Sequence, residues 1–196
     1  MLFRQITDAG LSQYAYLVGC QRTGDALLID PQRDIDRYDA IAAAEGLRIA
    51  VVTETHIHAD FLSGVREYAE RPDVRIVLSK AGTPDWQYRW LEQSRAPVTL
   101  VGDGDRFMVG HIEIEARHTP GHTPEHLVFV VIDRGSGADT PIGVATGDFL
   151  FVGDLGRPDL LESAAGHQGA MVANLGGNAV HMRDVVAAIE AAFSSS

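Results

Sequence analysis

The sequence has few of the features that mark secreted or membrane proteins. Cys20 is the one cysteine, so no disulfide can form within the chain, and such sparse use is typical of proteins in a reducing cytosol. Residues 1–8 lack the long apolar segment of a signal peptide, and no other stretch is long enough to span a membrane. We therefore expect a cytoplasmic protein.

Positive charge is also scarce. The chain has 16 Lys and Arg against 27 Asp and Glu, which gives a net charge of −11. This balance argues against nucleic acids and anionic membranes as partners. An anionic substrate would need a local basic group. With 196 residues and 45% hydrophobic content, the chain is long enough for one globular domain with a sizeable core.

Two histidines and a carboxylate follow a short apolar run. Residues 49–52 (IAVV) predict a buried strand, and residues 53–61 (TETHIHADF) place His56, His58 and Asp60 at its end. In α/β proteins this end of the strands carries the chemistry, and the spacing allows the side chains to converge on one metal ion. The alternative is that one histidine is a buried polar residue and the aspartate caps a helix.

A second histidine cluster, residues 117–126 (RHTPGHTPEH), directly follows another predicted strand. Its Pro-Gly pair predicts a sharp turn, and the flanking prolines restrict the backbone around His122, which suits a ligand that must be aimed. His118 is interpreted as a structural residue at the end of the strand. His126 begins the next strand and belongs either to the core or behind a ligand. His122 is the candidate ligand.

A third cluster, residues 145–154 (ATGDFLFVGD), ends an apolar strand in Gly-Asp. Asp148 would thus lie at the same rim as the histidines, and a buried carboxylate there needs a positive partner, which a metal supplies. The alternative is an ordinary turn aspartate. Asp154 is a weaker candidate, because residues 153–156 (GDLG) are more typical of a turn.

The rest of the sequence predicts strands joined by tight turns and then strands alternating with helices, the pattern of an α/β sandwich with a mixed sheet. Helices are expected from residue 35 to 46 and over 62–69, and residues 85–90 are interpreted as a packed loop or short helix rather than an aromatic ligand site. The expected strands are residues 2–6, 14–18, 26–29, 49–52, 74–78, 97–101, 107–109, 111–116, 127–132 and 142–145.

The order Thr-His-x-His-x-Asp, Thr-Pro-Gly-His-Thr and Thr-Gly-Asp resembles the metallo-β-lactamase superfamily over residues 1–162. The stretches at 30–38, 54–61, 85–86 and 152–161 resemble its persulfide dioxygenase branch, in particular the N-terminal domain of the dioxygenase–rhodanese fusions. The resemblance implies an αβ/βα sandwich with an abbreviated C-terminal part. It also implies a non-haem Fe(II) dioxygenase that oxidises glutathione persulfide, or a similar low-molecular-weight persulfide, to sulfite with O2.

The resemblance further implies one metal ion per chain. Phe61 stands where dinuclear members carry a second histidine, and phenylalanine cannot bind metal. The implied ligands are His56, His122 and Asp148. Two histidines and one carboxylate form the facial triad suited to Fe(II) and O2, although the same set can hold zinc.

Other site residues are implied in the same way. His58 and Asp60 would orient His56 or bound water from behind. Arg157 matches the position whose arginine contacts a glutathione carboxylate in relatives, with a surface ion pair as the alternative, and Thr123 would also contact the substrate.

The C-terminal part departs from the family. Residues 163–177 are rich in Gly and Ala and predict a loop, and residues 178–196 predict a final helix with a frayed end, where relatives complete the second half of the fold. An apolar surface uncovered in this way could drive homodimer formation. Two other functions therefore stay open: a zinc-dependent thioester hydrolase of glyoxalase II type, and a catalytically impaired module that binds metal or thiol.

Overall fold

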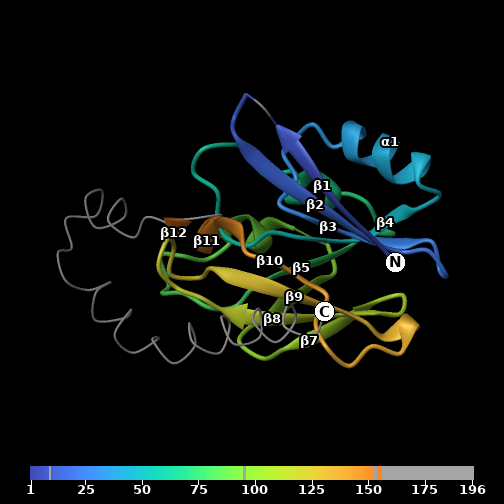
Figure 1. Cartoon of the computed structure of the whole chain (residues 1–196). Helices are drawn as coiled ribbons and strands as arrows, with labels where there is room; N and C mark the ends of the chain where they lie inside the picture. Colours follow the sequence, from blue (N-terminus) through green and yellow to red (C-terminus); the bar gives the residue numbers. More distant parts are fainter. Residues whose placement is uncertain (9, 95, 152–153, 156–196) are drawn as a thin grey trace.

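A computed structural model describes residues 1–8, 10–94, 96–151 and 154–155 of the chain (Figure 1). Its framework is a six-stranded sheet, a four-stranded sheet and a two-stranded pair. The loop predicted over 163–177 and the helix predicted over 178–196 lie outside the described residues. Within the described residues, no helix has the length and apolar character needed to cross a membrane.

The six-stranded sheet follows the chain order from one edge to the other. Its first three strands pair antiparallel, and the pairs from β3 to β6 are parallel. The parallel arrangement places the ends of β3 and β4 at one edge, where Thr53 pairs with Ile29. The strands are β1 (Leu2–Asp8), β2 (Gln13–Cys20), β3 (Asp25–Ile29), β4 (Arg48–Thr53), β5 (Arg75–Ser79) and β6 (Val98–Val101).

The four-stranded sheet is antiparallel throughout, in the order β10-β9-β8-β7. Alternation is clear in β8, where Ile112, Ile114 and Ala116 are all fully buried, because successive side chains of a strand point to opposite faces. The strands are β7 (Arg106–Val109), β8 (Ile112–His118), β9 (Leu127–Asp133) and β10 (Gly143–Ala145), and the separate pair is β11 (Leu150–Phe151) and β12 (Asp154–Leu155).

Two hydrophobic cores hold these layers together. One lies on the helical face of the six-stranded sheet, where Tyr38 and Tyr68 are fully buried. The other lies between the sheets and contains Leu27 and Val77 from one sheet and Phe129 from the other. Figure 1 shows α1 over one face of β1–β4, with β7–β10 on the opposite side. The helical segments are α1 (Asp36–Ala44), α2 (Val65–Tyr68), η1 (Arg89–Gln93), η2 (Arg134–Ser136) and η3 (Gly147–Phe149).

The predicted α/β sandwich is confirmed, with corrections at two elements. The helix expected over 62–69 spans only Val65–Tyr68, because Ser63 pairs with Gln32 in an isolated β-bridge just before it. The prediction of a turn over residues 153–156 is also wrong at Asp154, because Asp154 is a strand residue that pairs with Phe151 in the β11–β12 ladder.

Candidate metal centre

Asp30 organises the loop that follows β4. It comes directly after β3, is 2% exposed and has a left-handed backbone with φ of 53°, which a non-glycine residue adopts at some energetic cost. Its carboxylate accepts hydrogen bonds from the Thr55 amide (2.6 Å) and the Thr55 hydroxyl (2.9 Å). The other side chain at this carboxylate is His58, whose Nε2 lies 3.1 Å from Oδ1. The ends of two neighbouring parallel strands are therefore joined through one buried aspartate.

The same contacts determine the tautomer of His56. The Thr55 hydroxyl has a single proton, which it donates to Asp30, so the Thr55 oxygen accepts from His56 Nδ1 at 2.9 Å. With the proton on Nδ1, the Nε2 lone pair is free to bind a metal. Burial, together with the neighbouring histidines, lowers the pKa of His56, which keeps the ring neutral as a ligand must be.

His122 and Asp148 approach His56 from the other sheet. His122 lies in the turn between β8 and β9, and its Nε2 is 3.4 Å from Asp148 Oδ2. Its ring is perpendicular to that of His56, with centroids 4.8 Å apart. Asp148 lies in η3, just after β10, and its side chain is 45% exposed. Burial raises the pKa of Asp148, with His122 acting in the opposite direction.

These three side chains fit one metal ion. One ligand atom from each of His56, His122 and Asp148 lies within 4.8 Å of the others. The donor set is two imidazoles and a carboxylate, which suits Fe(II) and also zinc. Asp148 is only partly buried, so the expectation of a buried carboxylate is wrong, and a cation at the centre would offset the partial desolvation that disfavours its charged form.

The remaining predicted residues surround this group. His58 is bonded to Asp30 rather than to His56, although the two histidine rings are in contact at 4.1 Å between centroids. Burial lowers the pKa of His58, but the carboxylates of Asp30, Glu54 and Asp60 together raise it, so the net shift is upward. Asp60 is exposed, and Phe61 packs on the His58 ring at 4.2 Å.

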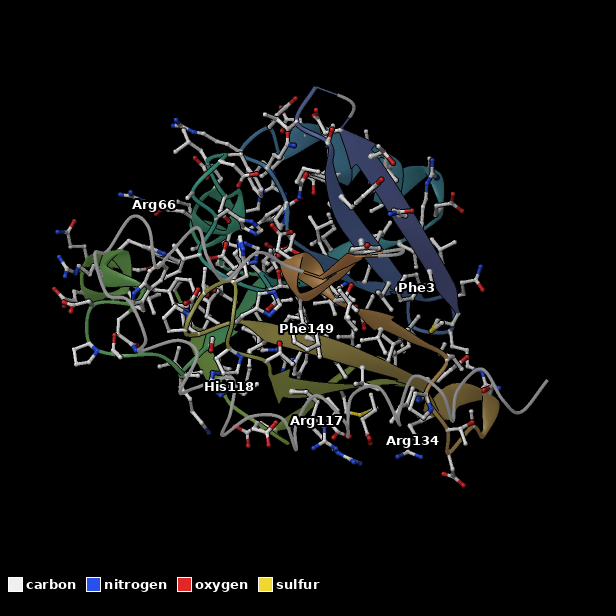
Figure 2. All side chains as sticks on the ribbon, turned by 60° about the vertical axis from the view of Figure 1, so that its left-hand side comes forward. Phe3, Arg66, Arg117, His118, Arg134 and Phe149 are labelled. Carbon is white, nitrogen blue, oxygen red and sulfur yellow. The ribbon has the colours of Figure 1, made fainter. Side chains whose placement is uncertain are left out.

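The turn that carries His122 is held by its own side chains. The His118 ring contacts the Pro124 carbonyl at 2.8 Å, in agreement with a structural role. His126 is fully buried, its Nδ1 lies 2.9 Å from the Thr119 hydroxyl, and burial lowers its pKa to about 3. The Thr123 hydroxyl donates to Glu125 at 3.0 Å, and Thr123 is 5% exposed. Phe149, labelled in Figure 2, is the last residue of η3, and its ring centroid is 6.3 Å from that of His126.

Two hollows flank the loop of residues 53–61. One, of about 690 Å³, reaches Asp148 and is lined by the β1–β2 hairpin, Asp60, Phe61 and Leu150. Among the described residues that line it there is no Lys or Arg. The other, of about 760 Å³, includes Trp86 and Trp90, so the tryptophan segment lines a hollow as well as packing as a loop with a short 3-10 helix.

The family model described as metallo-β-lactamase superfamily matches residues 8–185. The chain belongs to this superfamily. Among curated relatives, the mitochondrial persulfide dioxygenase ETHE1 of Bos taurus is 30% identical over 171 residues, which cover 84% of this chain and 59% of that protein. The cytoplasmic hydroxyacylglutathione hydrolase of Arabidopsis thaliana is 33% identical over 148 residues, which cover 74% and 51%.

Solved structures of the superfamily agree with the fold. A metallo-β-lactamase from Staphylococcus aureus subsp. aureus COL has a TM-score of 0.77 at 45% identity, over 85% of this chain and 48% of that one. ETHE1 from Myxococcus xanthus has a TM-score of 0.61 at 32% identity, over 78% and 59%. The chain thus spans between 48% and 59% of the length of these four proteins.

Two buried carboxylates beside the candidate ligands are not among the site residues predicted from the sequence. Asp30 could have been found, because an aspartate at the end of an apolar strand carries the same signal that identified Asp148. Glu125 gave no signal, because its partners lie 68 positions away at Ile57 and two positions away at Thr123. Arg157 lies outside the described residues, and the side chain of Asp154 is not described.

Proposed function

We propose that the chain binds one Fe(II) ion through His56, His122 and Asp148 and oxidises a low-molecular-weight persulfide, such as glutathione persulfide, to sulfite. The observation that carries this proposal is the grouping of two histidines and one carboxylate within 4.8 Å. Phe61 beside it supplies no ligand for a second ion. Relatives named persulfide dioxygenase support the choice of substrate.

The overall reaction is balanced as persulfide plus O2 plus water giving thiol plus sulfite. Iron held by His56, His122 and Asp148 would supply the redox chemistry that a reaction between a persulfide and O2 requires. The chain's own residues prepare this site. The Asp30–Thr55 bonds place the proton of His56 on Nδ1 and aim its ring, while Asp148 lines the 690 Å³ cleft from which substrate would approach.

Arg157 is proposed as the cation that holds a substrate carboxylate. This role rests on the resemblance of residues 152–161 to the persulfide dioxygenase branch. Replacing Arg157 with Ala should raise KM for glutathione persulfide and change kcat little, because the clamp binds ground state and transition state alike. Arg22→Ala, at an exposed turn, is the matched control. An unchanged KM would contradict the proposed role of Arg157.

The proposal that Thr123 contacts substrate stays a prediction, since its hydroxyl is bonded to Glu125.

A zinc-dependent thioester hydrolase is the second candidate. The same three ligands can hold zinc with an open position for water, and a relative is named hydroxyacylglutathione hydrolase. A catalytically impaired module that binds metal or thiol is the third. Turnover separates this module from both enzymes, and dependence on O2 separates the two enzymes from each other.

The deciding experiment measures O2 uptake by anaerobically purified, Fe(II)-loaded protein given glutathione persulfide, with sulfite assayed in parallel. We expect uptake with stoichiometric sulfite, abolished in His122→Ala and retained in His111→Ala, an exposed histidine remote from the site. A folded, iron-loaded protein that takes up no O2 would overturn the dioxygenase proposal. Hydrolysis of S-lactoylglutathione by the zinc-loaded protein would then favour the second candidate.

A further inference from the structure

Glu125 is a buried carboxylate between the two histidine turns. Its side chain is 0% exposed. One carboxylate oxygen, Oε1, accepts the Ile57 amide at 2.7 Å and the Thr123 hydroxyl at 3.0 Å. Ile57 directly follows His56, and Thr123 directly follows His122. A single oxygen atom therefore contacts the backbone beside one candidate ligand and the side chain beside the other.

We propose that Glu125 is a positioning residue that fixes His56 and His122 relative to each other so that both can bind one metal ion. The inference rests on the metal centre proposed above. Glu125 is not itself a member of the group of ligand atoms that converge on the ion. Its effect on the metal is exerted through the two hydrogen bonds.

The energetic cost of this glutamate supports a specific role. A carboxylate taken out of water is costly unless charge or hydrogen bonds compensate it. Burial raises the pKa of Glu125, and its hydrogen bonds and the nearby His122 act in the opposite direction. Its side-chain oxygen accepts hydrogen bonds from Ile57, 68 positions away, and from Thr123, two positions away, and these donors stand beside the two histidines.

Packing holds the carboxylate in place. The loop after β5 passes so closely that a Cβ built at Gly82 would lie 3.0 Å from the Glu125 Cβ. At Thr55, the residue before His56, the backbone carbonyl accepts a hydrogen bond from the Leu127 amide at 2.7 Å. His56 is thus held at the residue before it by a backbone bond and at the residue after it by Glu125. Two attachments fix its rotation as well as its distance from His122.

The test compares three glutamate variants by anaerobic titration with Co(II), a spectroscopic probe of the same ligands. Glu125→Gln keeps a carbonyl oxygen for both donors, and Glu125→Ala removes it. Glu115→Ala is the matched control, because Glu115 is also buried, at 5% exposure, but pairs with Arg106 and Arg117. We expect roughly 10- to 100-fold weaker Co(II) binding and an altered visible spectrum in Glu125→Ala. The glutamine variant and Glu115→Ala should bind like the wild type.

Equal Co(II) affinity in Glu125→Ala and the wild type would overturn the inference while leaving the metal centre intact. An equal loss of Co(II) affinity in Glu125→Ala and Glu115→Ala would also overturn the inference, because it would indicate general destabilisation of the protein. A wild-type protein that binds no Co(II) would overturn the metal centre and the inference together.

A second pair of variants covers the case in which Glu125→Ala fails to fold. Thr123→Val removes one of the two donors with little change in shape, and Thr123→Ser restores it. We expect weaker Co(II) binding in the valine variant and recovery in the serine variant. Valine and serine variants of equal affinity would contradict the role of this bond.

Discussion

At the scale of single residues, burial controls which histidines can carry charge. His56 and His126 are both buried, at 2% and 0% exposure, and burial lowers the pKa of each, that of His126 to about 3. Their rings are stacked, with centroids 5.1 Å apart. A neutral candidate ligand and a neutral histidine beside it suit metal binding, but they make the metal-free protein sensitive to acid.

The sign of this effect follows from proton linkage. An unfolded histidine titrates near its ordinary pKa of about 6.5, whereas folded His126 resists protonation until about pH 3. Its contribution to stability is therefore present above pH 6.5 and is lost as pH falls through this window. In metal-free protein, His126→Gln should reduce the slope of unfolding free energy against pH by about 1.4 kcal/mol per unit between pH 6 and 4.5.

Urea unfolding of EDTA-treated protein at several pH values measures this slope. His111→Gln, at an exposed position, should leave the slope unchanged. A slope in His126→Gln equal to that of the parent would show that His126 accepts its proton in the folded state.

At the scale of elements, the site is built from turns at strand ends. β4 and β8 deliver His56 and His122, and η3 delivers Asp148. Gly147 permits the close approach of η3 to the β4 turn. Its φ is 50°, and a Cβ there would lie 2.4 Å from Thr55 Oγ1 and 2.9 Å from His126 Nε2.

A matched pair of glycines isolates this contact. Gly104 also has positive φ, of 75°, but a Cβ there would meet nothing within 4 Å. Gly104→Ala should cost about 1–2 kcal/mol of unfolding free energy from backbone strain alone. Gly147→Ala should cost more and should weaken metal binding, because Asp148 must move with the displaced turn. Urea unfolding and zinc titration measure both effects, and equal metal affinity in the two variants would contradict this account.

The strand ends were predictable because their signals are local. Apolar runs, Pro-Gly pairs and Gly-Asp pairs determine where a strand stops. From them the sequence predicts that His56, His122 and Asp148 follow strand ends, and in the structure they do. The helix over 62–69 was overestimated because the bridge between Gln32 and Ser63 is a tertiary contact. The hydrogen bonds of Asp30 and Glu125 reach across 25 and 68 positions and have no local pattern.

At the scale of the whole molecule, the ligand group links the two sheets. His56 follows a strand of the six-stranded sheet, while His122 and Asp148 follow strands of the four-stranded sheet. A bound ion would therefore connect the layers directly, in addition to the apolar core between them. Unfolding would separate the ligands and release the ion.

Metal should consequently stabilise the protein by mass action. At a free metal concentration about 100 times Kd, the unfolding free energy should rise by about 2.7 kcal/mol. Thermal unfolding with Fe(II) under anaerobic conditions, compared with EDTA, measures the shift, and His122→Ala should abolish it. Elemental analysis of the loaded protein should give one iron per chain. An unchanged Tm in the wild type would contradict a metal shared between the sheets.

The sequence by itself determined the fold class and the residue types at three turns, because hydrophobic period and turn chemistry act over a few residues. Only the tertiary structure decided which side chains meet. Sheet pairing and packing bring Asp30 against Thr55 and His58, and Glu125 against Ile57. The identities of the candidate ligands are thus local information, whereas the aim of their side chains and the tautomer of His56 depend on contacts that exist only once both sheets are packed.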